Sequence, residues 1–154
     1  MNSSDARKSV INVCAYFYEV LVSKFLELER AFHNQSGLLS LFKKINYSDR
    51  ANAFNGLLER AIEAKKELSL IRDDEIDPEL YSLLAKLTEC IAIYINMVSA
   101  QVEINTNLNL KANGERYNWN DYSKSTQCFG MLRSGLEIEL PKLQSLYSTI
   151  LRFN

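Results

Sequence analysis

The chain has 154 residues, of which 47% are hydrophobic and 24% are charged, and its formal net charge is −1. These values predict one folded domain over residues 1–154 and exclude a disordered chain, which has few apolar residues and a high net charge. Lys and Arg are not in excess, which argues against nucleic acid as a partner, because proteins that bind phosphate backbones neutralise them with basic side chains. Only five glycines and two prolines are present, so we expect a few long helices.

The first predicted helix runs from about Ser4 or Asp5 to His33. Apolar residues recur along it at helical spacing, which places them on one face: Val10, Cys14, Phe17, Leu21, Leu28 and Phe32. A second apolar stripe beside the first one ends at Leu26. Gly37 interrupts the pattern, and the apolar residues 38–45 that follow predict a short extra helix.

The second and third predicted helices are separated by an acidic turn over residues 73–77. Ser48 is a candidate N-cap of the second helix, which we expect to end near Arg72. Asp77 then caps the third helix, and Pro78 takes the first helical position, where its missing N–H costs nothing. The third helix is predicted to continue to about Lys111.

The third predicted helix is apolar on two sides. One side carries Leu80, Leu84, Leu87, Ile91, Tyr94 and Val98, and the other carries Leu83, Cys90, Met97 and Ile104. A helix of this kind packs against two neighbours, or against one neighbour and a second subunit. The pattern therefore leaves a homo-oligomer open.

The last predicted helix begins at Trp119 or Asn120 and ends near Arg152. Pro141 lies inside its apolar pattern and lacks the N–H of a helical bond, so we expect a kink or break between residues 134 and 141. Four rods with short connections predict an all-α, up-down antiparallel four-helix bundle.

Several kinds of catalytic and metal site are excluded by composition. His33 is the only histidine, whereas di-iron bundles need two Glu-x-x-His motifs and zinc enzymes commonly use several histidines. Glu29 and His33 lie four residues apart on one helical face, but one such pair is not a metal site. The chain also lacks glycine-rich phosphate loops. We therefore predict no metal, no cofactor and no catalytic residue.

The cysteines and the apolar segments bear on localisation. Cys14, Cys90 and Cys128 are odd in number and far apart, as expected of free thiols in a reducing compartment. The continuous apolar stretch at Leu87–Val98 is shorter than the roughly 20 residues that cross a bilayer. These features predict a cytoplasmic protein without a membrane segment.

Candidate binding residues cluster after the turn signal Asn113-Gly114. They are an arginine and three aromatic residues, Arg116, Tyr117, Trp119 and Tyr122. Trp, Tyr and Arg are enriched at the energetic centres of protein interfaces, and loops tend to carry binding residues. A purely structural role, in which the rings pack the turn onto the end of the bundle, is the other interpretation.

Two functions from different classes remain. The first is a non-enzymatic interaction module that binds another protein, similar in character to small immunity proteins, antitoxins, chaperones or regulators. The alternative is a helical enzyme or small-ligand-binding protein with a polar pocket between helices, for which the candidate residues are His33, Tyr94, Glu103 and Arg133.

Overall fold

The computed structural model describes residues 2–35 and 45–152. An N-terminal rod consists of α1 (Ser3–Tyr16), a π-helical segment (Phe17–Val22) and α2 (Ser23–Gln35). The next elements are α3 (Tyr47–Ser69), a short 3-10 turn (Asp73–Glu75), α4 (Pro78–Ala112) and α5 (Trp119–Arg152).

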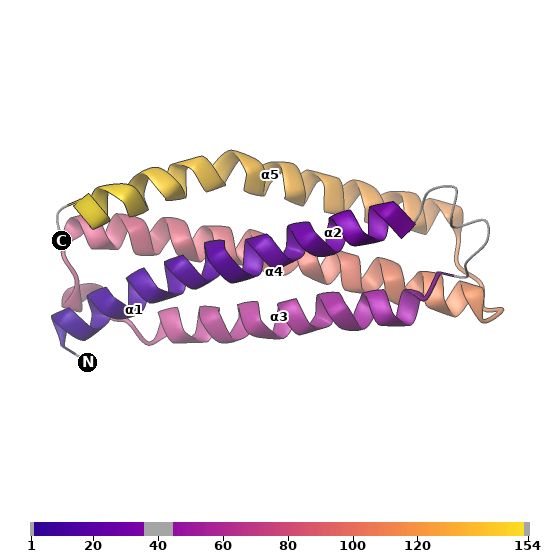
Figure 1. Cartoon of the computed structure of the whole chain (residues 1–154), viewed down its shortest axis with the longest axis horizontal. Coiled ribbons are helices and arrows are strands. Elements are labelled where there is room, and N and C mark those ends of the chain that lie inside the picture. The colour runs from indigo at the N-terminus through magenta and orange to yellow at the C-terminus, as the bar shows by residue number, and fades with distance from the viewer. Residues whose placement is uncertain (1, 36–44, 153–154) are drawn as a thin grey trace.

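Successive rods run in opposite directions, and both chain ends lie at the same end of the molecule (Figure 1). The described residues contain no strand. The predicted all-α, antiparallel four-helix bundle is therefore confirmed. The extra helix predicted at 38–45 falls almost wholly outside the described residues.

Side-chain caps set the starts of α1, α3 and α4, and the cap of α1 is Asn2, which accepts from the Asp5 amide at 2.9 Å. The Asp77 carboxylate accepts a hydrogen bond from the Leu80 amide at 2.8 Å, with Pro78 in the first helical position, as predicted. The cap of α3 is Asn46, whose side chain accepts from the Asp49 amide at 3.0 Å. The prediction of Ser48 was wrong because Asn caps a helix as well as Ser does, and Asn46 comes first along the chain.

Helix α4 is the central element of the core. It packs against both α3 and α5, which accounts for its two apolar sides. The N-terminal rod crosses the other helices obliquely on one face of the bundle (Figure 1). It buries a line of apolar side chains there, namely Ala6, Val10, Val13, Cys14, Phe17, Leu21 and Phe25.

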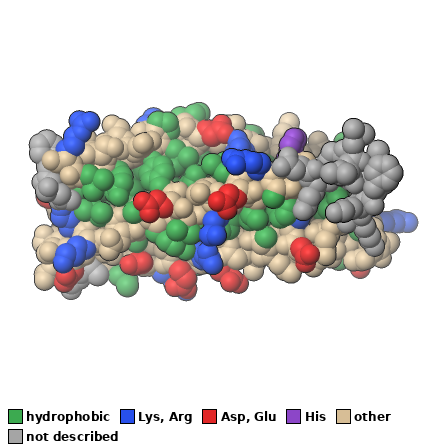
Figure 2. Space-filling model, in the orientation of Figure 1, with side chains coloured by type: hydrophobic (Ala, Val, Ile, Leu, Met, Phe, Trp, Pro, Cys, Tyr) green, Lys and Arg blue, Asp and Glu red, His purple; other side chains and the backbone are tan. Residues whose placement is uncertain are grey.

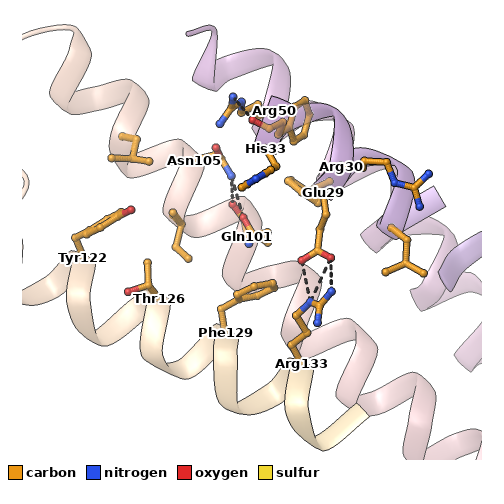
Figure 3. A pocket seen from close by; sticks show the side chains of 15 residues that line it. Glu29, Arg30, His33, Arg50, Gln101, Asn105, Tyr122, Thr126, Phe129 and Arg133 are labelled. Atoms are coloured by element: carbon orange, nitrogen blue, oxygen red, sulfur yellow. Dashed lines mark hydrogen bonds and ion pairs between the residues drawn. The ribbon is translucent and has the colours of Figure 1, made fainter. Parts of the chain in front are cut away.

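The π-helical segment changes the rotation of the N-terminal rod. A π-helix bonds each amide to the fifth residue before it, so it takes more residues per turn than an α-helix and rotates the side chains that follow. Leu28 and Phe32, predicted on the first apolar face, are only partly buried, and Leu26, at the end of the second stripe, is exposed. Glu29, by contrast, points inward, toward α5 (Figure 3).

Helix α5 continues through Pro141 as one element. The predicted break is therefore absent, although Figure 1 shows the rod to be bowed. Leu136 and Leu143 are buried on either side of the proline, and this packing outweighs the loss of one backbone bond. Just before the proline, the Leu140 carbonyl accepts a hydrogen bond from the Tyr18 hydroxyl at 2.6 Å.

The three cysteines lie in two different environments. Cys14 and Cys90 are buried, and Cys128 is exposed. Desolvation raises the pKa of the Cys14 and Cys90 thiols to about 12. The two buried thiols are therefore protonated near neutral pH, and the thiolate is the reactive form.

We predict that iodoacetamide at pH 8 alkylates the folded protein only once, at Cys128. Intact mass spectrometry followed by peptide mapping measures this directly. The same protein in denaturant should accept three alkyl groups, which serves as the control. Rapid modification of Cys14 or Cys90 in the folded protein would contradict the burial described here.

Candidate functional site

The predicted binding residues lie on the turn from α4 to α5. Asn113 ends α4, and Gly114, at φ 92°, takes the left-handed conformation that favours glycine. The Glu115 amide donates back to the Leu110 carbonyl at 3.0 Å, and the Gly114 amide donates to the Lys111 carbonyl at 3.1 Å. This C-terminal motif satisfies the last carbonyls of α4 and directs the chain into α5.

Three of the four predicted residues form one aromatic cluster. The Tyr122 ring lies 5.3 Å from the Trp119 ring and 6.2 Å from the Tyr117 ring, centroid to centroid. Tyr117 and Tyr122 are half-buried, as expected of rings that only pack the turn onto the end of the bundle. Trp119, in contrast, is 71% exposed. Arg116 is exposed beside the cluster, and its guanidinium makes no ion pair with the described residues.

A shallow depression of about 240 Å³ lies at this aromatic cluster. It is lined by Leu108, Lys111, Tyr117, Trp119 and Tyr122. Packing of the turn explains why Tyr117 and Tyr122 are half-buried, but it does not explain why the larger Trp119 side chain is exposed to solvent. Trp119 is therefore the one ring of the cluster whose position the packing of the turn does not account for.

A larger pocket of about 630 Å³ lies next to the turn, between α2, α3, α4 and α5. Its size falls within the range of about 300–1,000 Å³ that is usual for small-ligand sites. Tyr122 lines both the pocket and the depression. Figure 2 shows the histidine on the surface at this end of the molecule, close to basic and acidic side chains.

A bidentate ion pair forms one side of the pocket. The Arg133 Nη2 atom lies 2.8 Å from Glu29 Oε1, and Nε lies 3.0 Å from Oε2. The Nη1 atom of the same guanidinium also bonds the Glu137 carboxylate. The hydrogen bond to Glu29 raises the pKa of Arg133. The pair links α2 to α5, and its two charges compensate each other (Figure 3).

Two carboxamides of α4 form another part of the wall. Asn105 is only 4% exposed, and its Nδ2 atom donates to the Gln101 carbonyl at 2.8 Å and to Gln101 Oε1 at 3.2 Å. The ring of His33 lies close to these amides, and the hydroxyl of Tyr122 points toward the same space (Figure 3). These four side chains come from three helices that only the folded bundle brings together.

Arg50 supports the rim of the pocket. Its Nη2 atom donates to the Phe32 carbonyl at 3.1 Å, and the guanidinium stacks over the Phe32 ring at 4.8 Å and the Tyr47 ring at 5.8 Å. Desolvation lowers the pKa of Arg50. These contacts hold the last turn of α2 against the first turn of α3.

Two of the four residues suggested for a polar pocket line it, namely His33 and Arg133. Tyr94 is instead in the core, where its hydroxyl donates to the Leu21 carbonyl at 2.7 Å. Glu103 is exposed and does not line the pocket. Within residues 2–35 and 45–152, no three His, Cys, Asp or Glu side chains gather as a metal site would require.

No protein-family model matches the chain, and no curated protein or solved structure is significantly similar to it. The functional argument therefore depends on the two sites described above.

Length and composition alone would allow two described helices to cross a membrane, Ser3–His33 and Pro78–Ala112. The second helix includes the Leu87–Val98 stretch and extends well beyond it on both sides. The core helices of soluble proteins pass the same test, and Lys86 within α4 forms ion pairs with Glu89 and Glu139 at 2.8 and 2.7 Å. The cytoplasmic location stays a prediction.

Proposed function

We propose that this chain is a non-enzymatic interaction module that binds another protein through the turn between α4 and α5. The exposure of Trp119, at 71%, is the observation that carries the proposal. A tryptophan side chain buries about 150–250 Å² at an interface, so covering its exposed part removes a large apolar area from water and favours association. Arg116, beside it, supplies a planar set of donors for carboxylate or carbonyl groups of the partner.

The outer face of α5 supplies a second apolar feature. Met131 and Ile138 are 75% and 63% exposed, and their seven-residue spacing places them on the same face of the helix. A second copy of the chain, and not the partner at the turn, is a suitable occupant of this face. Met131 also provides a control, because it matches Trp119 in exposure but lies away from the turn.

We predict that Trp119→Ala and Arg116→Ala each weaken the partner complex by about thirtyfold, the effect of losing a hot-spot residue worth about 2 kcal/mol. Met131→Ala should change the affinity less than twofold. The partner is first captured from the native source and identified, and the affinities are then measured by calorimetry. Trp119 is the only tryptophan, so its emission should shift to shorter wavelength when the purified partner covers it.

Unchanged affinity in both turn variants, with native helicity, would exclude the turn as the binding surface. An effect of Met131→Ala alone would move the proposed surface to the outer face of α5.

The pocket of about 630 Å³ between the helices favours a second candidate function, the binding of a small ligand. Its walls combine aromatic rings with amide, hydroxyl and imidazole groups, the usual composition of ligand sites. An interaction module and a ligand-binding protein are compatible here, because the pocket and the turn share only Tyr122 among the predicted turn residues.

A further inference from the structure

Two carboxamides on the pocket wall use only part of their hydrogen-bonding capacity. Asn105 Nδ2 donates to the Gln101 carbonyl at 2.8 Å and to Gln101 Oε1 at 3.2 Å. Because a backbone carbonyl only accepts, these bonds fix which end of the Asn105 amide is nitrogen and which is oxygen. Asn105 Oδ1 is left as an acceptor and Gln101 Nε2 as a donor, and no described residue bonds to either atom.

Asn105 is an uncommon place for an unbonded acceptor. The residue is only 4% exposed, yet its Oδ1 atom is not fully enclosed by the protein. Buried polar groups are nearly always bonded to protein, water or ligand. Since Asn105 and Gln101 both line the pocket, a molecule in the pocket can satisfy the acceptor of one and the donor of the other.

The guanidinium groups that line the pocket are engaged or directed elsewhere. Arg133 is bonded to two carboxylates. Arg50 donates to the Phe32 carbonyl, and Arg30 points away from the space in front of Gln101 (Figure 3). We therefore expect a neutral ligand, because the groups that remain available to it are the amides.

Aromatic rings lie beside the two carboxamides. Phe129 and Tyr122 present their rings from α5 (Figure 3), and Phe54 and Ile104 are buried in the same wall. Such rings pack well against a planar apolar group. The ligand should therefore combine a ring with a polar edge that carries one donor and one acceptor.

We propose that the pocket binds a neutral aromatic carboxamide, a primary amide attached to a ring. Its N–H group donates to Asn105 Oδ1, its carbonyl accepts from Gln101 Nε2, and its ring lies against Phe129 and Tyr122. One amide can meet both atoms because the two side chains are joined by a hydrogen bond and lie side by side (Figure 3). This inference rests on the second candidate function, the binding of a ligand in the pocket, and adds the chemical class of that ligand.

The test compares three probes of nearly the same shape. Benzamide carries the donor and the acceptor, acetophenone has a methyl group in place of the amine, and benzoate is charged and has no donor. NMR titration of the isotope-labelled chain gives each dissociation constant and follows the side-chain amide signals of Gln101 and Asn105. We expect benzamide to bind at least about tenfold more tightly than either analogue, because an analogue without the donor leaves Oδ1 unpaired.

The variant Gln101→Met localises the effect. Methionine matches glutamine in length and helix propensity, and Asn105 keeps its bond to the backbone carbonyl of residue 101. The dissociation constant of benzamide should rise about fivefold, the effect of losing one hydrogen bond. Gln144→Met makes the same change at an exposed position of α5 outside the pocket and should leave the constant unchanged. Circular dichroism checks helicity in both variants.

The outcomes separate the carboxamide class from the ligand-binding function. Equal binding of benzamide and acetophenone, or tighter binding of benzoate, would overturn the class but retain the pocket as a ligand site. No binding of any probe would overturn both. Benzamide binding that leaves the Gln101 and Asn105 signals unmoved, or that is unchanged in a folded Gln101→Met variant, would overturn the assignment of these two amides.

Discussion

Phe17→Ala is expected to lower the free energy of unfolding by about 3–5 kcal/mol, the cost of deleting a large buried aromatic side chain. Phe17 is fully buried at the start of the π-helical segment. Its ring packs edge-on against Tyr94 and Tyr18, with centroid distances of 5.6 and 6.0 Å. The surrounding helices are rigid elements that fill the resulting cavity only in part, so most of the penalty remains.

Urea denaturation followed by circular dichroism measures the change in unfolding free energy. Met131→Ala is the control, since Met131 is 75% exposed and surface substitutions usually stay within about 0.5 kcal/mol. A loss below about 1 kcal/mol for Phe17→Ala would contradict the position of this ring in the core.

The second large effect concerns the hydroxyl of Tyr94, which donates to the Leu21 carbonyl at 2.7 Å inside the core. Leu21 belongs to the π-helical segment, in which the ordinary pairing of carbonyls and amides is altered. Tyr94→Phe removes the donor and leaves this carbonyl buried, at an expected cost of about 1–3 kcal/mol. No comparable cavity forms, because only one oxygen atom is lost.

Tyr81→Phe is the matched control for this substitution, because Tyr81 lies on the same helix and is 48% exposed. Its unfolding free energy should change by less than about 0.5 kcal/mol. Hydrogen exchange adds a local measurement, since amides of the Phe17–Val22 segment should lose protection in Tyr94→Phe more than amides of α3 do. Equal stability of the two variants would contradict the role of this bond.

The helices were predictable because their signals are local. The Asp77 cap and Pro78 fix the start of α4 within two adjacent residues, and Trp119 was a predicted start of α5. The two apolar sides of α4 predicted either two packing neighbours or one neighbour and a second subunit, and the fold shows two neighbours, α3 and α5. Of the predicted kink or break near Pro141, the break is absent and the helix is bowed (Figure 1). The local cost of the proline was visible in the sequence, whereas the packing that keeps the helix continuous depends on the other helices.

The π-helical segment was not predictable from apolar spacing, which assumes one constant number of residues per turn. The π-helical segment rotates the residues that follow it, and Glu29 on the next helix contacts Arg133, which lies 104 residues later in the chain. The sequence placed Glu29 and His33 on one face but offered no sign of which neighbour that face meets. Gln101 and Asn105 also line the pocket, and neither was among the residues suggested for it.

The turn residues were easier to find than the pocket because they are close together in sequence. Composition alone singled out Arg116, Tyr117, Trp119 and Tyr122, and the structure brings the last three rings together. Whether they bind a partner stays a prediction, as do the single domain and the homo-oligomer. The pocket, by contrast, exists only when four helices have assembled.

The alternating direction of the four rods has a practical consequence for every experiment above. Both ends of the described chain lie at one end of the molecule, and the turn from α4 to α5 lies at the other (Figure 1). Tyr122, next to this turn, is one of the residues that line the pocket. At 1.5 Å per residue, the 34 residues of α5 separate the two ends by roughly 50 Å. An affinity tag, a fluorophore or a sensor surface attached at either terminus therefore leaves both candidate sites unobstructed.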